Sequence, residues 1–373
     1  MRQACRFWKR WTVGCLSFCL GLIAAGKPAA ACDKSESFAF YPKPPPSLEW
    51  NLFASGPAET SSTWSRDARG LLSDPSSCQA PPSEILRTIV SASLSRGMLV
   101  LAGEIHDNPD QHAFRAYLLG WRSAPPGIAS KPPALVFEHI RIDQQPALDQ
   151  FAEFNAKARR PGHSPGNSGD LFRFLEWDKS GWPDKKIFEP LFSAAIAAKL
   201  PILPGDPSRE RVRAIARGGD AALTDDERQR FKLGQPLAAR LQDALLDELE
   251  ASHCGLMPKT AFVNMAVAQR YRDAHLADAL AKAAGKHGSA ILLAGNGHVR
   301  KDRGVPYYLR QMAPDRKAVS VMLLEVEEGR DDPAAYIPRD PQGKPAADYI
   351  LFTPRAERKD PCAEMRARFG QKK

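Results

Sequence analysis

Short apolar runs alternate with longer segments of helical periodicity between residues 82 and 325. Two of the runs, 98–102 and 290–294, are wholly apolar, and each is followed by glycine and then by polar residues. Runs of this kind are typical of strands buried in a parallel sheet. The predicted strands are 98–102, 133–137, 200–203, 289–295 and 318–325. The main predicted helices are 82–95, 109–121, 143–156, 187–198, 208–216, 236–251, 260–284 and 305–312. We therefore expect an α/β fold, with a mainly parallel sheet flanked by helices.

The pattern divides the chain into four parts. Residues 1–31 begin with cations, continue through an apolar stretch and end in three alanines, which predicts a cleaved signal peptide. Residues 32–81 are rich in Pro and Ser and are expected to form an extended leader. Residues 82–355 are predicted to form one α/β domain, in which the helices of 207–284 form an insertion between strands. A charged tail follows over 356–373.

The charge of the chain excludes one class of partner. The net charge is +9, but five cations and no acid lie in residues 1–31, so the remainder carries only +4. No nucleic-acid-binding motif occurs, and we predict no nucleic-acid partner. The leader predicts export, either to the periplasm or to the outer membrane as an anchored lipoprotein. In the second case a lipidated Cys32 would attach the chain to the membrane.

Four cysteines remain after the predicted cleavage: Cys32, Cys78, Cys254 and Cys362. An even number of cysteines in an oxidising compartment fits two disulfides. The sequence leaves the connectivity open, because four cysteines allow three pairings. Lipidation of Cys32 would instead leave one thiol without a partner.

Polar groups that can carry chemistry follow the predicted strands. Glu104 and His106 follow the first strand, Glu138 follows the second, and His298 follows the fourth. In open α/β sheets the carboxyl ends of the strands form the ligand crevice, so we expect these side chains to converge. Glu104 and His106 point to the same side of an extended segment, which lets the carboxylate orient the imidazole. A buried group of this kind needs cations. The candidate cations are Arg209, Arg211, Arg272 and Arg300.

The same residues also have structural interpretations. Glu104 can cap the helix that is predicted to start at 109, and His106 and His298 can be ordinary loop or turn residues. His112 is expected to be structural. The sequence contains no Walker loop, no dinucleotide-binding glycine fingerprint and no His-Glu-x-x-His motif, which excludes the sites that these motifs build.

Several segments, taken together, resemble a known family. The opening motif is Gly103-Glu104-Ile105-His106-Asp107-Asn108, and the closing motif is the segment 295–306, which begins Gly-Asn-Gly-His. Between them lie Glu138, the strand 200–203 and a Gln-x-x-Arg-Asp helix at 269–273. These segments resemble the ChaN-like haem-binding uptake family, in a superfamily with the Tiki/TraB and erythromycin-esterase groups. The chain departs from the family pattern at His275, where Met is expected, and at Gly205-Asp206.

The resemblance implies an envelope protein that binds haem and takes part in haem or iron uptake or handling. Tyr307 and Tyr308 follow the closing motif and are candidate haem ligands. Arg209 and Arg300 are candidate partners of the haem propionates. Haem or another small ligand is then the expected partner, and the oligomeric state, including a homodimer, stays open.

The strand-end residues also support an alternative, a hydrolase. His106 or His298 would then act as the general base toward water. Glu104 or Glu138 would orient that base, and Arg272 would stabilise an oxyanion. A divalent metal held by these residues is a variant of the same hypothesis, although no residue is assigned as a metal ligand. A third hypothesis is a scaffold protein whose polar cluster carries no chemistry.

Overall fold

The computed structural model describes residues 51–55, 65–66, 71–73, 82–119, 132–157 and 165–369. Contacts divide the chain into two units, Met1–Pro42 and Lys43–Lys373, and every described residue belongs to the second unit. The predicted signal peptide and the two cysteines Cys32 and Cys78 lie outside the described residues. In the part of the chain that is described, no helix is long and apolar enough to cross a membrane.

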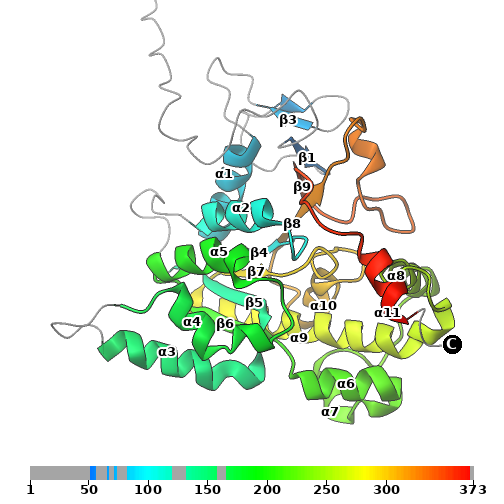
Figure 1. Ribbon diagram of the computed structural model, residues 1–373, viewed down its shortest axis with the longest axis horizontal. Helices are drawn as coiled ribbons and strands as arrows, with labels where there is room; N and C mark the ends of the chain where they lie inside the picture. Colours follow the sequence, from blue (N-terminus) through cyan, green and yellow to red (C-terminus); the bar gives the residue numbers. More distant parts are fainter. Residues whose placement is uncertain are drawn as a thin grey trace, which may run out of the picture. The chain divides into compact units, whose positions relative to one another are not determined.

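The described residues form one sheet of nine strands in the order β2-β3-β1-β9-β8-β4-β7-β5-β6 (Figure 1). The six strands from β9 to β6 are parallel to one another, whereas β1, β2 and β3 pair antiparallel at the other end. The strands are β1 (Leu52–Ala54), β2 (Ser65–Arg66), β3 (Leu71–Ser73), β4 (Leu99–Ala102), β5 (Ala134–Arg141), β6 (Ile202–Asp206), β7 (Ala290–Leu293), β8 (Ala318–Glu325) and β9 (Tyr349–Thr353). The predicted α/β fold with a mainly parallel sheet is confirmed.

β4 lies between β7 and β8, and all four of its residues are buried. Leu101 pairs with Leu292 on one side and with Ser320 on the other. Because both faces of the sheet are covered, side chains on both faces of this strand are apolar, which explains the unbroken hydrophobic run. Polar residues that follow such a strand are placed together at the edge of the sheet.

Helices cover both faces of the sheet (Figure 1). α1, α2 and α5 pack in succession on one side, and α9 and α10 pack together on the other. The helices are α1 (Pro82–Ser95), α2 (Pro109–Leu119), α3 (Gln145–Lys157), α4 (Ser168–Phe174), α5 (Lys185–Ala197), α6 (Arg209–Gly218), α7 (Asp225–Arg230), α8 (Ala239–Ser252), α9 (Val263–His287), α10 (Val305–Met312) and α11 (Pro361–Phe369). α9 is the longest of them and contacts β4, β5, β6 and β7.

The sequence of α9 determines which of its residues face the sheet edge. Gln269, Arg272 and Asp273 are three and four positions apart, so they lie on one face of the helix. The helix ends at Gly288, whose φ of 89° lies in the left-handed region that favours glycine. This end allows the chain to turn directly into β7.

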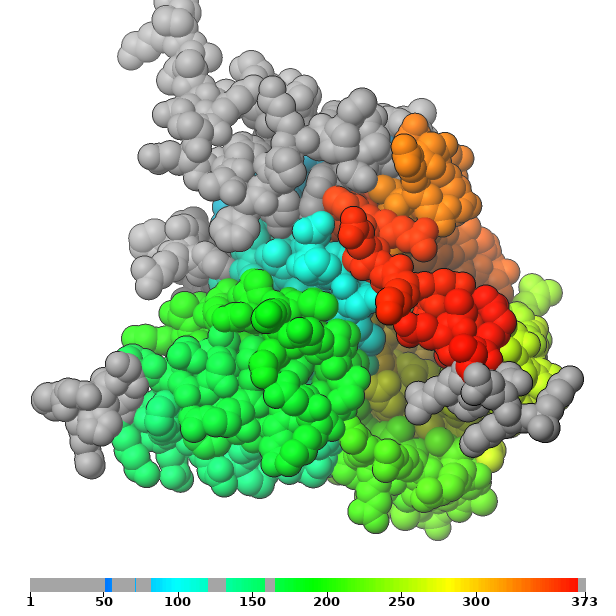
Figure 2. Space-filling model, viewed as in Figure 1, coloured from blue at the N-terminus to red at the C-terminus, as the bar shows by residue number. Residues whose placement is uncertain are grey.

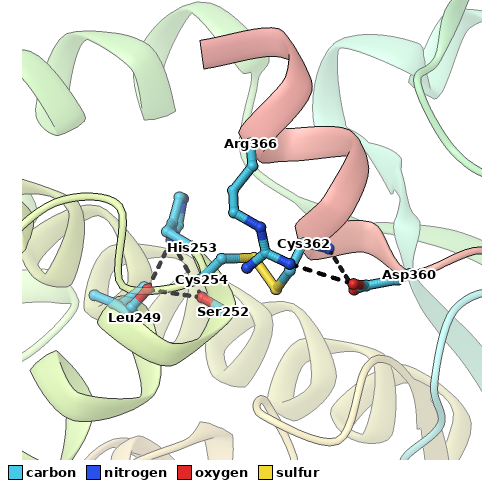
Figure 3. Close-up of a disulfide and its surroundings, with 7 residues drawn as sticks. All are labelled: Leu249, Ser252, His253, Cys254, Asp360, Cys362 and Arg366. Atoms are coloured by element: carbon cyan, nitrogen blue, oxygen red, sulfur yellow. Dashed lines mark hydrogen bonds and ion pairs between the residues drawn. A yellow bond between two sulfur atoms is a disulfide. The ribbon is translucent and has the colours of Figure 1, made fainter. Parts of the chain in front are cut away.

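A disulfide joins α11 to the rest of the described unit (Figure 3). Cys254 lies just after α8, and Cys362 lies in α11, 108 residues later. Figure 2 shows α11, in red, on the surface of the molecule. Closing a loop of this length stabilises a fold by about 4–5 kcal/mol in the chain-entropy model. The bridge is one of the pairings that the sequence leaves open.

Several strands differ from the sequence prediction. The predicted strand 133–137 is wrong at its end, because β5 continues through Glu138 and His139 to Arg141. β1, β2, β3 and β9 were not predicted, and the first three lie within the predicted leader. All four are short, and β1 pairs with β9, which is distant in sequence, so local pattern does not reveal them.

Candidate functional site

The carboxyl edge of the sheet, where β4, β5, β6 and β7 end, gathers the polar residues that follow these strands. Glu104 and His106 follow β4, Glu138 lies near the end of β5, and His298 follows β7. Arg272 reaches the same edge from α9. We call Glu104, His106, His112, Arg115 and His139 the Glu104 group, and Glu138, Asp206, Arg272, Asp273 and His298 the Glu138 group.

Glu104 is the centre of the first group and is 2% exposed. His106 Nδ1 donates to Glu104 Oε1 over 2.6 Å, and His139 Nε2 donates to the same oxygen over 3.3 Å. Arg115 Nη2 lies 3.8 Å from that oxygen, and His112 Nε2 lies 3.6 Å from Glu104 Oε2. A buried carboxylate is therefore compensated by one guanidinium and by the polar edges of three imidazoles.

Arg115 supplies the fixed positive charge of this group. Burial raises the pKa of Glu104, but Arg115 and His106 outweigh it, so that pKa lies well below its usual range. Arg115 Nη2 also donates to His112 Nδ1 over 2.8 Å, and His112 Nε2 donates to the His106 carbonyl over 3.0 Å. Burial and Arg115 hold the pKa of His112 well below its usual value, so His112 is a neutral bridge between Arg115 and the backbone.

His106 is the member of the Glu104 group that faces solvent, with 38% of its side chain exposed. The rings of His106 and Trp182 lie 4.9 Å apart, and Trp182 Nε1 donates to the His139 carbonyl over 3.1 Å. Burial alone would lower the pKa of His106, but Glu104 more than reverses this and raises it. Because Glu104 fixes a proton on Nδ1, Nε2 of the neutral imidazole is available to a water or a ligand.

Glu138 is the centre of the second group and is 1% exposed. Arg272 Nη2 donates to Glu138 Oε1 over 2.8 Å, and the Gly295 amide donates to Oε2 over 2.7 Å. Arg272 also forms a bidentate pair with Asp206, over 2.8 Å and 3.1 Å, which is the strongest geometry for such a pair. Burial raises the pKa of Glu138, but His298 and Arg272 outweigh it, so that pKa lies well below its usual range.

His298 lies between two carboxylates. Its Nε2 is 3.1 Å from Glu138 Oε1, and its Nδ1 is 2.6 Å from Asp273 Oδ1. Burial would lower the pKa of His298, but Glu138 and Asp273 outweigh it and raise the pKa to about 10. His298 is therefore a cation at neutral pH and holds its proton too tightly to serve as a general base.

Gly295 connects the two groups. Its amide donates to Glu138, and a Cβ at this position would lie 2.8 Å from Cε1 and 3.1 Å from Nε2 of His106. The ring of His106 therefore lies directly against the backbone of the closing motif, a close approach that glycine allows. The opening and closing motifs thus meet in space, as their positions after adjacent strands predict.

The Glu104 group is not fully hydrogen-bonded within the described residues. Glu104 Oε2, His139 Nδ1 and the Nε and Nη1 atoms of Arg115 are buried without a hydrogen-bond partner. Ligand atoms of Glu104, His106 and His139 lie within 4.8 Å of one another, a spacing that can hold a metal ion. These donors fit a divalent ion in type, but the nearby guanidinium of Arg115 already supplies positive charge and opposes a second cation.

The two predicted tyrosine ligands lie in α10. Tyr308 is fully buried, and its Oη accepts a hydrogen bond from Arg270 Nε over 3.2 Å. Tyr307 is half-buried and packs edge-on against Tyr308, with the ring centroids 5.1 Å apart. Neither tyrosine hydrogen-bonds to a member of the Glu104 or Glu138 group, and their role as haem ligands stays a prediction.

The two predicted propionate partners also lie outside these groups. Arg300 forms a bidentate pair with Asp302, over 3.0 Å and 2.8 Å, and is 8% exposed. Arg209 is exposed and donates to the Ser180 carbonyl. Of the four cations that the sequence proposed for the buried carboxylates, Arg272 is the one that reaches them, since Arg211 pairs with Glu227.

Two members of the groups were not assigned from the sequence: Arg115 and Asp273. His139, the residue after Glu138 in β5, points toward Glu104. A signal was present for Asp273, because it shares a helix face with Arg272 in the Gln-x-x-Arg-Asp motif. The spacing of His112 and Arg115, three apart on α2, carried a similar signal.

The two departures from the family pattern contact each other. His275 Nδ1 donates to the Gly205 carbonyl over 2.8 Å. A Cβ on Gly205 would lie 2.8 Å from both Leu276 Cδ2 and Val136 Cγ1, so the position is closely packed. Asp206, the next residue, is the partner of Arg272, so these departures hold the third strand end in place.

The comparisons with known proteins identify the family of this chain. A family model described as haem-binding uptake, Tiki superfamily, ChaN, matches residues 90–309, which is more than half of the chain. The chain belongs to this family, and the resemblance inferred from its motifs is confirmed. No curated protein matches the sequence.

Two solved structures illustrate the likeness. One, described as cofacial haem binding to ChaN of Campylobacter jejuni, is 20% identical, with a TM-score of 0.52, and the match covers 72% of this chain and 90% of that one. The other, the type III effector HopBA1, is 14% identical, with a TM-score of 0.36, over 72% of this chain and 93% of that one. The first of these supports the fold.

Proposed function

We propose that this protein binds haem as a cargo in haem or iron uptake. The observation that carries the proposal is the match of residues 90–309 to the haem-binding uptake family. The related ChaN structure from Campylobacter jejuni is described as binding haem, and it shares the fold of this chain. The proposal therefore rests on family membership. It also requires that the described residues provide the groups that bind a tetrapyrrole.

A haem site needs an apolar surface, cations for the propionates and an iron ligand. The structure places Tyr308 in the core and pairs Arg300 with Asp302, so these residues would have to rearrange to bind haem. Apolar side chains and cations without acidic partners do occur together, around a cavity of about 510 Å³ where β4 and β8 begin. These residues therefore offer the apolar surface and the cations that a tetrapyrrole needs.

We also propose that the protein works outside the cytoplasm. The Cys254–Cys362 disulfide supports this location, because such bonds persist in oxidising compartments and are rare in the cytosol. The predicted export leader gives the same location. Attachment through Cys32 and dimer formation stay predictions.

The test of the haem proposal is a titration of the protein, without its predicted leader 1–31, with haemin. The expected result is a saturable, red-shifted Soret band at a stoichiometric ratio. A change that grows without saturation, as with haemin in a solution of an unrelated protein, would contradict the proposal. The same protein purified from haem-replete cells should be coloured.

A second candidate function, hydrolysis, is favoured by the solvent-facing His106. Its Nδ1 is held by the buried Glu104, and its Nε2 is available to take a proton from an attacking water. The cationic Arg272 and His298 lie in the neighbouring group and can stabilise negative charge. The rate of such a reaction would rise as the pH rises through the raised pKa of His106.

The hydrolase candidate is tested with a panel of ester and amide substrates. His106→Gln should abolish any hydrolysis, whereas His253→Gln, a change at a half-buried histidine after α8, should leave it intact. Metal analysis of the purified protein distinguishes metal-dependent hydrolysis from metal-free hydrolysis. Hydrolysis that persists in His106→Gln would contradict the mechanism in which His106 is the general base.

A further inference from the structure

The last part of the described chain, residues 354–369, is held to the molecule at two points. It follows β9 as an irregular stretch and ends in α11. We call it the C-terminal strap. One attachment is the pair of ion pairs that Arg358 forms, and the other is the Cys254–Cys362 disulfide. We propose that the strap limits access to His106 at the carboxyl edge of the sheet, and that a dithiol reductant opens it by reducing this disulfide.

The first attachment lies beside the opening motif. Arg358 Nε donates to Asp107 Oδ2 over 2.7 Å, and Arg358 Nη1 donates to Glu325 Oε2 over 2.6 Å. Asp107 is the residue after His106, and the side chain of Asn108 donates to the first carbonyl of the strap over 3.0 Å. The strap is thus bound to the residues that directly follow the solvent-facing imidazole of His106.

The second attachment lies near the closing motif. Cys254 follows α8, and Glu248 of α8 pairs with Arg303 of the closing motif. A Cβ on Gly297, in the same motif, would lie 3.4 Å from Glu248 Oε1. The strap therefore extends from the opening motif to the helix beside the closing motif. Figure 2 shows a hollow next to the red strap, with yellow residues on its floor.

The strap has little packing of its own to hold it in place. Over residues 354–367, the part of the strap whose side chains are described, every side chain is half-buried or exposed. Apolar burial is the main source of stability for a docked helix, and a helix as short as the nine residues of α11 is marginal alone. The position of α11 therefore depends on the disulfide.

The disulfide is also accessible to a reductant. Both Cys254 and Cys362 are half-buried, and Figure 3 shows their bond between α11 and the turn after α8. Leu256 and Met257, which follow Cys254, are 40% and 44% exposed. Exposed disulfides are the ones that exchange readily, whereas bonds enclosed in a core resist reduction. The two exposed apolar side chains offer a contact surface to a protein that carries a dithiol.

The opening step is a thiol–disulfide exchange. A thiolate of the dithiol attacks one sulfur of the Cys254–Cys362 bond, and the other sulfur leaves as a thiolate and takes up a proton. The second thiol of the reductant then breaks the mixed disulfide. The protein gains two electrons and two protons as two thiols, and the dithiol becomes a disulfide. α11 is then free to leave α8, with Arg358 as the remaining attachment.

The test measures how fast His106 reacts with diethyl pyrocarbonate, which modifies accessible imidazoles, by mass spectrometry of the peptide that contains it. The protein without residues 1–31 is compared before and after treatment with dithiothreitol, a small dithiol. Hydrogen exchange of the α11 amides in the same samples reports release of the strap. His287 is the internal control, because it lies at the opposite, amino edge of the sheet, where β4 and β8 begin.

A double variant, Cys254→Ser with Cys362→Ser, removes the bond without a reductant. It separates the effect of this bond from any effect of the reductant on Cys32 and Cys78, and dithiothreitol should change nothing further in it. Slow hydrogen exchange in β4 verifies that the variant is folded. Arg358→Gln releases the other attachment and keeps the disulfide, so reduction of this variant should free the whole strap.

Reduction of the wild-type protein should raise the rate of His106 modification at least about threefold and the exchange of α11 at least about tenfold, because local opening exposes both. The double serine variant should show the same rates without a reductant, and His287 should react at one rate throughout. In Arg358→Gln, reduction should raise His106 reactivity further. Unchanged His106 reactivity after α11 is released would overturn control of access by the strap. Unchanged exchange of α11 after reduction would overturn the disulfide as its attachment. Neither readout depends on haem, so a failed haemin titration would leave this proposal in place.

Discussion

The two edges of the same parallel sheet differ in their charged groups: the carboxyl edge holds buried carboxylates, and the amino edge holds exposed cations. At the carboxyl edge, Glu104 and Glu138 are almost completely buried and are compensated by arginine and histidine. At the amino edge, Arg96 and Lys317 are exposed and have no acidic partner among the described residues. Buried, paired charges determine structure and protonation, whereas exposed, unpaired charges remain available to a ligand. The comparison therefore separates a site that can move protons from a site that can hold an anion.

The largest expected effect comes from removing a cation at the carboxyl edge. Arg272→Met leaves Glu138 and Asp206 buried without their shared partner, and we expect a loss of about 3–5 kcal/mol in the free energy of unfolding. Arg96→Gln, at the amino edge, should change the free energy by less than about 0.5 kcal/mol. Urea denaturation of both variants measures the difference. Equal losses would show that the two edges do not differ as described.

The next effect is a pH-dependent one at His298. The pKa of His298 is raised to about 10 in the folded protein, from a usual value near 6.5. The stability that its charge contributes is therefore complete below about pH 6.5 and is lost as the pH rises toward 10. His298→Gln should cost about 1.5–3 kcal/mol at pH 6 and clearly less at pH 10. Urea midpoints of wild type and variant from pH 6 to 10 test this, and a constant difference would contradict a charged His298.

A smaller effect is expected where the two groups meet. In Gly295→Ala the new Cβ would lie 2.8 Å from His106 Cε1, so the ring must move, at about 1–3 kcal/mol. Gly285→Ala is the matched control, because nothing lies within 4 Å of its Cβ and it sits within α9. The control should be neutral or stabilising by up to about 1 kcal/mol. Thermal unfolding measures both, and a harmless Gly295→Ala would mean that His106 does not lie against this backbone.

The smallest effect belongs to the amino edge. Lys317→Gln removes one of several cations that form no ion pair among the described residues, so the free energy of unfolding should stay within about 0.5 kcal/mol or rise slightly. The change should be largest at low salt, since salt screens repulsion between exposed charges. Urea denaturation at low and high salt gives the comparison. A marked loss of stability would show that Lys317 is already paired in the free protein.

Much of this arrangement follows from local sequence. The unbroken apolar runs of β4 and β7 predict buried parallel strands, and the carboxyl-edge rule then places Glu104 and His298 together. The alternation of side chains in an extended segment predicts the Glu104–His106 pair, which the structure shows at 2.6 Å. These inferences succeed because they depend on neighbouring residues and on the regular geometry of strands.

The cations were harder to predict. Arg209 and Arg300 were candidate cations for the buried carboxylates and for the haem propionates, but Arg300 has a local acid two residues away that satisfies it first. Arg115, which the Glu104 group uses, lies on an amphipathic helix where a buried arginine looks like a surface residue. Its burial depends on the packing of α2 against α5, which no local pattern states. The amino-edge cavity likewise appears only when α1, α10 and the loop before β8 are assembled.

One measurement tests the account most directly. Crystals of the protein grown with haemin, with diffraction data collected at the iron absorption edge, would locate the metal by its anomalous signal. We expect an ordered iron peak bound to the protein, because the chain belongs to a haem-binding uptake family. A map without an ordered iron peak would contradict haem binding by this chain.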